Sequence, residues 1–190
     1  MTDRIDLPPR VILGIDASLR HTGLVVIDMK NRKVLVSETV RLEYIRKGKK
    51  LTPKQCFAKI AGNIFELARE YSHILTHVAI EDIFMNPNQR SGAMSLFASH
   101  GIGIGVSAIT LGIDSDEIDE RLTIIPPKSI KKIVSGSGNA DKHGVEVGVL
   151  AWLKKRGFTG IDLLTSRGDN DEFDACATAI SSLYYKQGEK

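Results

Sequence analysis

The stretch VILGIDASLRHTGLVVID, residues 11–28, contains two apolar runs separated by a short polar loop. Each run has the length and the β-branched composition of a buried strand, so we predict one strand near 11–16 and a second near 23–29. The first run ends in Asp16, and a carboxylate at the end of a buried strand is costly to desolvate unless a positive group meets it. Asp16 is therefore either a strand-end residue in contact with water or part of a cation site.

Three further carboxylates also lie at the end of an apolar run or at the start of a helix, where they can come close to Asp16. A later apolar run also ends in a carboxylate, Glu81. Asp171 and Asp174 open the last helical pattern three positions apart, so they lie on one helix face. The positive end of the helix dipole explains Asp171 as well as a metal would, but Asp174 precedes small apolar residues and is expected to face inward.

Together the four carboxylates predict a divalent-metal site. Mg²⁺ prefers oxygen ligands and keeps several waters, so a few carboxylates can serve two ions. Two ions roughly 4 Å apart can activate a water and neutralise the leaving 3′ oxygen of a phosphodiester.

The remaining pattern predicts an α/β fold, a mixed sheet flanked by helices in a single domain over 1–190 with its core at about 11–185. Thr52 and Pro53 form a helix start, and Asn139 or Asp141 caps a later helix. Further strands are expected at 33–41, 74–81 and 122–125, and helices at 53–71, 89–111, 128–134, from the cap to about 156, and 170–186.

Composition favours a cytoplasmic protein, or one in a host cytoplasm if the gene belongs to a phage. Hydrophobic residues make up 42% of the 190 residues, and no apolar run approaches the roughly 20 needed to span a bilayer. The first ten residues lack the apolar core of a signal peptide. Cys56 and Cys176 lie in expected helices, so neither a disulfide nor a thiolate metal site is expected.

Charge is segregated along the chain although the net charge is only +3. Residues 31–60 contain nine Lys or Arg against two Glu, whereas 111–120 contain five acidic residues and no base. Segregation of this kind favours a face that binds a polyanion, although the densest cluster is equally consistent with solvated loops. That cluster consists of Arg46, Lys47, Lys49 and Lys50.

Other residues suit contact with nucleic acid. Lys142 follows a Gly-Ser loop at the start of a helix, an arrangement that grips phosphate, although a solvated lysine fits too. Phe84 is either an apolar wedge near the metal or an aromatic at the edge of the core. His21 and His143 are either neighbours of the metal ligands or polar surface residues, and we favour the surface interpretation. Three lysines on a short helix either track a DNA backbone or are simply solvated: Lys128, Lys131 and Lys132.

Four motifs stand out in the chain, namely LGIDASLRHTG at 13–23, AIEDIFM at 79–85, VSGSGNADK at 134–142 and DEFDACATAI at 171–180. They resemble those of the RuvC family of Holliday-junction resolvases, within the ribonuclease-H-like superfamily. They occur in family order over about 11–185. The resemblance implies a five-stranded mixed sheet and an endonuclease that resolves four-way DNA junctions by paired symmetric nicks. It also implies two Mg²⁺ or Mn²⁺ ions per site and a homodimer joined through the helix at 89–111.

The resemblance also implies roles for single residues. Asp16, Glu81, Asp171 and Asp174 would form the metal-binding acidic tetrad. Lys131 and Lys142 match catalytically important lysines of the family, and Phe84 matches an aromatic that engages bases at the junction centre.

The chain departs from the family at several points. Ala17-Ser18 stands where the family often has Pro-Gly, residues 42–54 are more basic, and 112–120 is unusually acidic. These differences indicate a divergent member, such as one from a phage or mobile element.

Several other functions remain open. The same fold could cut forks, flaps or RNA–DNA hybrids, or bind branched DNA without cutting it. An actin-like ATPase or sugar kinase shares the opening motif, but it generally needs two such domains, and 190 residues is too short for that. Association with branch-migration proteins cannot be read from the sequence.

Overall fold

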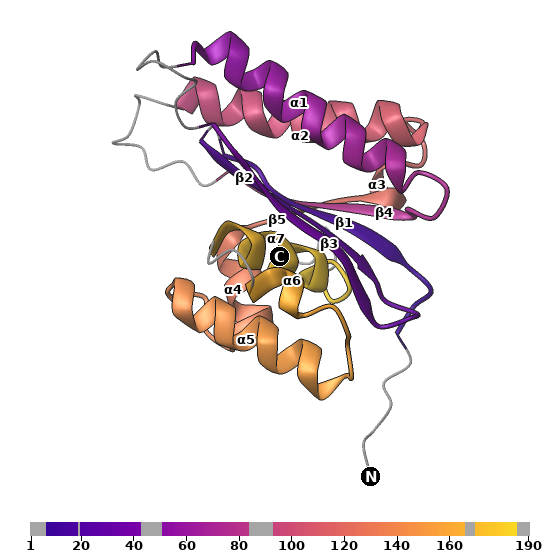
Figure 1. The fold of residues 1–190 in the computed structure, drawn as a ribbon, viewed down its shortest axis with the longest axis vertical. Coiled ribbons are helices and arrows are strands. Elements are labelled where there is room, and N and C mark those ends of the chain that lie inside the picture. Colours follow the sequence, from indigo (N-terminus) through magenta and orange to yellow (C-terminus); the bar gives the residue numbers. More distant parts are fainter. Residues whose placement is uncertain (1–6, 19, 43–50, 84–92, 166–169, 186–190) are drawn as a thin grey trace.

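The computed structural model describes residues 7–18, 20–42, 51–83, 93–165 and 170–185, which form a five-stranded sheet between two layers of helices (Figure 1). The strand order is β3-β2-β1-β4-β5. The first three strands form an antiparallel meander, and β4 and β5 run parallel to β1. The predicted mixed sheet is confirmed. Its strands are β1 (Val11–Asp16), β2 (His21–Asp28), β3 (Lys33–Arg41), β4 (His77–Glu81) and β5 (Leu122–Ile125).

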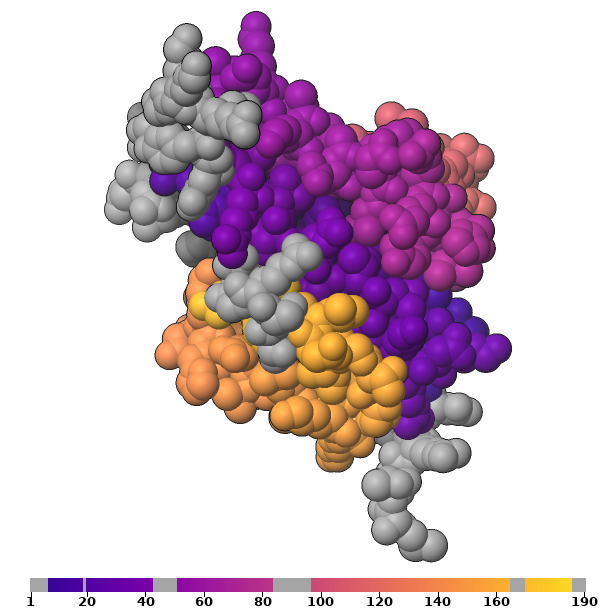
Figure 2. Space-filling view, viewed as in Figure 1, coloured from indigo at the N-terminus to yellow at the C-terminus, as the bar shows by residue number. Residues whose placement is uncertain are grey.

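Helices cover both faces of the sheet. One face carries α1 (Pro53–Glu70) and α2 (Ala93–Leu111), and the other carries α4 (Pro127–Ser135), α5 (Lys142–Lys155) and α7 (Asn170–Ser181). In the space-filling view, the two helical layers lie on either side of the strand residues (Figure 2). Within the described ranges, no helix is both long and apolar enough to cross a bilayer. Two short helices complete the fold, α3 (Ile118–Arg121) and α6 (Asp162–Thr165).

The helix starts follow the predicted caps. Thr52 forms a capping box with Gln55, and Asp141 rather than Asn139 caps α5 by accepting a hydrogen bond of 2.8 Å from the backbone N–H of Gly144. The acidic segment at 112–120 forms a turn that leads into α3.

Two predicted bounds were too long. The fourth strand begins at His77 rather than at 74, because Ile74 and Leu75 donate backbone hydrogen bonds to Tyr71 in a turn. The last helix ends at Ser181 rather than near 186, because the Ser182 hydroxyl bonds back to the carbonyl of Ala179 and the following residues form a turn.

Two glycines allow α7 to lie directly on the sheet. Gly14 in β1 and Gly23 in β2 face this helix, and a Cβ atom at either position would overlap its backbone, at the carbonyl of Ala175 or of Asp171 respectively. No other residue type permits this approach. Because alternate strand residues face opposite sides, Asp16 shares this face with Gly14, and the first turn of α7 is delivered beside it.

Candidate metal centre

Three carboxylates from two distant parts of the chain converge at the C-terminal end of the central strand β1. Asp16 ends β1, and Asp171 and Asp174 project from the first turns of α7. One oxygen from each lies within 4.8 Å of the others. Carboxylate oxygens are the donors that hard divalent cations prefer, so this donor set fits such an ion.

Glu81 ends β4 beside this cluster. Because β4 runs parallel to β1, Glu81 leaves the sheet at the same edge as Asp16, and both residues line one hollow together with Ser18 and Asp82. Glu81 is not among the three carboxylates that converge within 4.8 Å. Its charge nevertheless acts on them, since it raises the pKa of Asp16. Its role as a fourth ligand stays a prediction.

The cluster carries more negative charge than its surroundings compensate. Burial, followed by repulsion from Glu81 and Asp174, raises the pKa of Asp16 well above its ordinary value. Burial and then Asp174 raise the pKa of Glu81 to about 7. Burial also raises the pKa of Asp174. Each of these groups is stabilised by a proton or by a cation, so the electrostatics fit a metal ion as well as the donor atoms do.

Lys142 supplies part of the missing positive charge. It lies in the first turn of α5, with its Nζ 3.3 Å from Oδ1 of Asp171 and 3.9 Å from Oδ2 of Asp174. Burial lowers the pKa of Lys142, but the two aspartates outweigh burial and raise it overall, so the amine remains a cation. With 60% of its side chain exposed, Lys142 can also reach a phosphate group that approaches from solvent.

Lys131 is the member of the α4 lysine group that reaches the centre. Its charge lowers the pKa of both Glu81 and Asp174, which places it within electrostatic range of them. Lys128 and Lys132 are exposed on the same helix. The remaining predicted DNA contacts lie outside the described residues, namely Phe84, Arg46, Lys47, Lys49 and Lys50.

The sequence left open whether His21 lies next to the metal or on the surface, and it did not single out Glu172. The Nδ1 of His21 lies 3.4 Å from Oδ2 of Asp171 while 39% of its side chain is exposed, so this histidine is both a surface residue and a neighbour of the carboxylates. The Ser18 hydroxyl donates a hydrogen bond of 2.6 Å to the carbonyl of His21 and helps to hold that residue at the site. Glu172, next to Asp171, is completely buried. His143, by contrast, pairs with Glu146 along the surface of α5.

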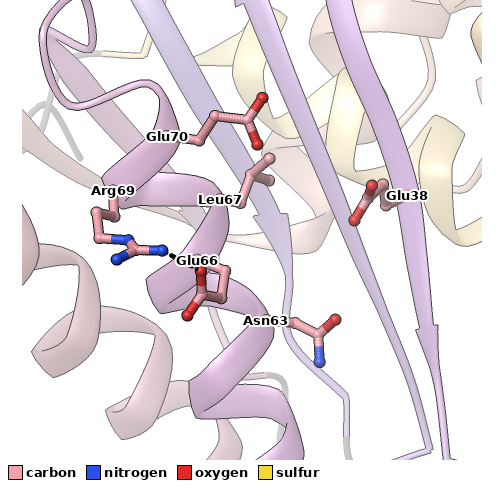
Figure 3. A pocket seen from close by; sticks show the side chains of 6 residues that line it. All are labelled: Glu38, Asn63, Glu66, Leu67, Arg69 and Glu70. Atoms are coloured by element: carbon pink, nitrogen blue, oxygen red, sulfur yellow. Dashed lines mark hydrogen bonds and ion pairs between the residues drawn. The ribbon is translucent and has the colours of Figure 1, made fainter.

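A second group of carboxylates lies on the opposite face of the sheet. Glu38 of β3 and Glu66 and Glu70 of α1 line an open hollow (Figure 3). Arg69 of the same helix pairs with Glu66 at 2.6 Å, and both side chains are 63% exposed. Glu66 and Glu70 are exposed and Glu66 is paired with Arg69, so this group lacks the burial that characterises the first.

Sequence relatives cover almost the whole chain. A family model described as "Crossover junction endodeoxyribonuclease RuvC" matches residues 12–181. A protein of that name from Dichelobacter nodosus is 32% identical over 176 residues, which are 93% of this chain and 86% of the relative. Another, from Francisella tularensis subsp. novicida, is 34% identical over 172 residues, which are 90% and 85% of the two chains.

Solved structures share the fold. Thermus thermophilus RuvC superposes with a TM-score of 0.66 at 21% identity, covering 92% of this chain and 94% of its own. The same enzyme in complex with a Holliday junction substrate gives 0.66 at 20% identity. The yeast mitochondrial Holliday junction resolvase Ydc2 gives 0.59 at 14% identity, covering 96% and 82% of the two chains. These neighbours confirm the predicted ribonuclease-H-like fold, and the matching model and relatives place the chain in the RuvC family of crossover junction endodeoxyribonucleases.

Proposed function

We propose that this protein is a metal-dependent endonuclease that resolves four-way DNA junctions by paired symmetric nicks. The observation that carries the proposal is the convergence of Asp16, Asp171 and Asp174 beside an exposed lysine, with the pKa of Asp16 and of Asp174 raised by burial. The name of the relatives supports the reaction, and the Holliday junction bound to a structural neighbour supports the substrate. As an enzyme of DNA recombination, the protein would act in the cytoplasm, as one nuclease domain.

Asp16, Glu81, Asp171 and Asp174 would hold two Mg²⁺ or Mn²⁺ ions. When bound, such ions supply an activated water and neutralise the leaving oxygen. The side chains of the protein keep four oxygen donors at one edge of the sheet, where burial and mutual repulsion disfavour their free ionised state. A site of this kind gains more from a cation than a solvated carboxylate pair does.

Lys142 would stabilise the negative charge that develops on the scissile phosphate. Its Nζ is held next to the carboxylates by Asp171 and stays charged because of them. Lys131 would contribute beside it. The outer contacts to the junction arms would come from Lys128, Lys132, Phe84, Arg46, Lys47, Lys49 and Lys50.

A homodimer would match the approximate two-fold symmetry of a four-way junction. α2 offers apolar surface for a second copy, since Phe97 and Ile109 are 50% and 83% exposed. Two copies related by a two-fold axis would bring two metal centres to two opposed strands.

Replacement of Asp16 tests the proposal. The purified protein, Asp16→Asn and the surface control Asp119→Asn would be incubated with end-labelled four-way junction, fork, linear duplex and RNA–DNA hybrid in Mg²⁺ or Mn²⁺. We expect symmetric nicks in the junction from the wild type and the control. Asp16→Asn should lower the rate more than about 1000-fold, since the loss of even one electrostatic contact to a transition state costs about 10²–10³. Junction binding by Asp16→Asn should stay near the wild-type level.

Other outcomes would redirect the proposal. Normal cutting by Asp16→Asn would show that the metal centre is wrongly assigned. Cutting mainly of hybrid or fork would retain the chemistry and change the substrate. Binding without any cutting would favour a branched-DNA-binding protein.

A further inference from the structure

Glu172 is a buried carboxylate that the proposed chemistry does not use. It follows Asp171 directly in α7 and has no solvent exposure. Its Oε2 accepts a hydrogen bond of 2.8 Å from the Ser37 hydroxyl, and its Oε1 accepts one of 3.3 Å from the Thr39 hydroxyl. A buried carboxylate requires such partners, so the two hydroxyls of β3 fix where this side chain lies.

The strand register explains why these hydroxyls are in reach. Asp16 pairs with Gly23 across β1 and β2, and Gly23 pairs with Thr39 across β2 and β3. The three residues form one row across the sheet and share one face. Two strand spacings separate the ends of this row, about 10 Å.

The first turn of α7 sits over the middle of this row. The carbonyl of Asp171 occupies the space that a side chain at Gly23 would fill. From there, Asp171 projects toward Asp16 on one side, and Glu172 reaches Ser37 and Thr39 on the other. The start of the helix is therefore fixed to β3 by Glu172, at the end of the row that carries no metal ligand.

We infer that Glu172 is a positioning residue, which holds the first turn of α7 across β2 so that Asp171 and Asp174 converge on Asp16. This inference rests on the proposed function, because it requires that the three aspartates bind a metal ion. Without the hydrogen bonds to β3, the turn is free to shift along the sheet, and the carboxylate oxygens no longer meet within the distance that one ion spans. The metal-binding affinity, rather than the stability of the fold alone, is the quantity that Glu172 controls.

The test compares Mn²⁺ binding by isothermal titration calorimetry in the full chain and four variants. Glu172→Ala removes the acceptor of the two hydrogen bonds to β3, and Ser37→Ala combined with Thr39→Val removes their donors. Glu172→Gln keeps two hydrogen bonds to β3 but removes the charge, because an amide can accept from one hydroxyl and donate to the other. Ser182→Ala removes a buried hydroxyl just beyond the far end of α7 and serves as the matched control. Thermal unfolding of each variant identifies a temperature at which all of them are folded, and the titrations are carried out at that temperature.

We expect Glu172→Ala and the double variant to raise the Mn²⁺ dissociation constant roughly 10-fold, the lower end of the effect of residues that orient metal ligands. Junction cleavage by Glu172→Ala should recover substantially at saturating Mn²⁺. Glu172→Gln and Ser182→Ala should bind Mn²⁺ like the wild type.

Two results would overturn the inference alone. One is an unchanged Mn²⁺ dissociation constant in Glu172→Ala. The other is an equal loss in Glu172→Gln and Glu172→Ala, which would mean that the charge of Glu172 matters and its position does not. If the wild type and Asp16→Asn bind Mn²⁺ equally, the metal site is wrongly assigned, and the positioning role of Glu172 is refuted together with it.

Discussion

Carboxylates gather on both faces of the sheet, in opposite environments. On the α7 face, Asp16, Asp171 and Asp174 converge, and burial raises the pKa of Asp16 and Asp174. On the α1 face, the glutamates of the second group line an open hollow, where Glu66 is paired with Arg69 in water (Figure 3). The number of acidic residues is similar. Burial, which Lys142 compensates only in part, is what distinguishes the candidate metal centre from the solvated acidic surface.

The packing of the two helices causes this difference. α7 contacts the sheet through its backbone at Gly14 and Gly23, so the polar side chains in its first turns lie close to the end of β1. α1 packs through side chains such as Ile60 and Ile64, which keep its acidic residues outside.

Gly23→Ala should have the largest effect, because the added methyl overlaps the carbonyl of Asp171. Overpacking of this kind typically costs about 1–3 kcal/mol, and a clash with backbone belongs at the upper end. Mn²⁺ binding and cleavage should be lost as α7 moves away. The control on the other face is Gly62→Ala in α1, where nothing lies within 4 Å, and it should raise the free energy of unfolding by up to about 1 kcal/mol. Denaturant unfolding compares the two, and equal stabilities would show that the close approach of α7 is unimportant.

Lys142→Gln should lower the single-turnover rate of junction cleavage about 10²-fold, the typical loss when one preorganised charge contact to a transition state is removed. Lys59→Gln removes an exposed lysine from α1 and should leave the rate unchanged. A similar small loss in both variants would reduce Lys142 to one of many surface charges that attract DNA.

The metal-free protein should lose stability as the pH rises from 4.5 to about 7, the range in which Glu81 titrates differently in the folded and unfolded states. The pKa of Glu81 is about 7 in the folded protein against an ordinary value of 4.5. Between these values the folded state binds more protons than the unfolded state, so the free energy of unfolding falls with rising pH. His77 acts in the opposite sense, since burial lowers its pKa to about 4. The difference between variant and wild type therefore cancels the contribution of His77 and reports Glu81 together with its repulsion of Asp16.

Melting temperatures in EDTA from pH 4.5 to 7.5 test this prediction. Glu81→Gln should melt several degrees above the wild type near pH 7 and no higher near pH 4.5. Glu70→Gln, on the α1 face, should follow the wild type throughout. A Glu81→Gln protein that melts like the wild type at every pH would contradict the proposed repulsion at the metal centre.

Arg69→Ala should have the smallest effect. It breaks the ion pair with Glu66, but both side chains are largely exposed, and such pairs contribute about 0–1 kcal/mol. Cleavage and Mn²⁺ binding should not change. A measurable loss of either would mean that the α1 face communicates with the metal centre.

Much of this arrangement was predictable because it depends on local patterns. Apolar runs marked the strands, Thr52 and Asp141 marked helix starts, and the three-residue spacing of Asp171 and Asp174 placed them on one helix face. The strand start at 74 and the helix end near 186 were wrong, because turn hydrogen bonds at Tyr71 and Ser182 compete with regular structure.

The remaining features required the register of strands that are distant in sequence. Nothing local to His21 shows that it meets Asp171, and nothing local to Glu172 shows that it meets Ser37. Both contacts exist because Gly23 lies between Asp16 and Thr39 in the sheet.

The sequence by itself determined the order of strands and helices, the carboxylates that could bind metal and the membership of a nuclease family, because periodicity and motif spacing are encoded along the chain. The tertiary structure decided which carboxylates converge, which one is held by hydroxyls and which ones stay in water. Burial and electrostatic repulsion depend on distances through space, and strand pairing and the close packing of α7 set those distances.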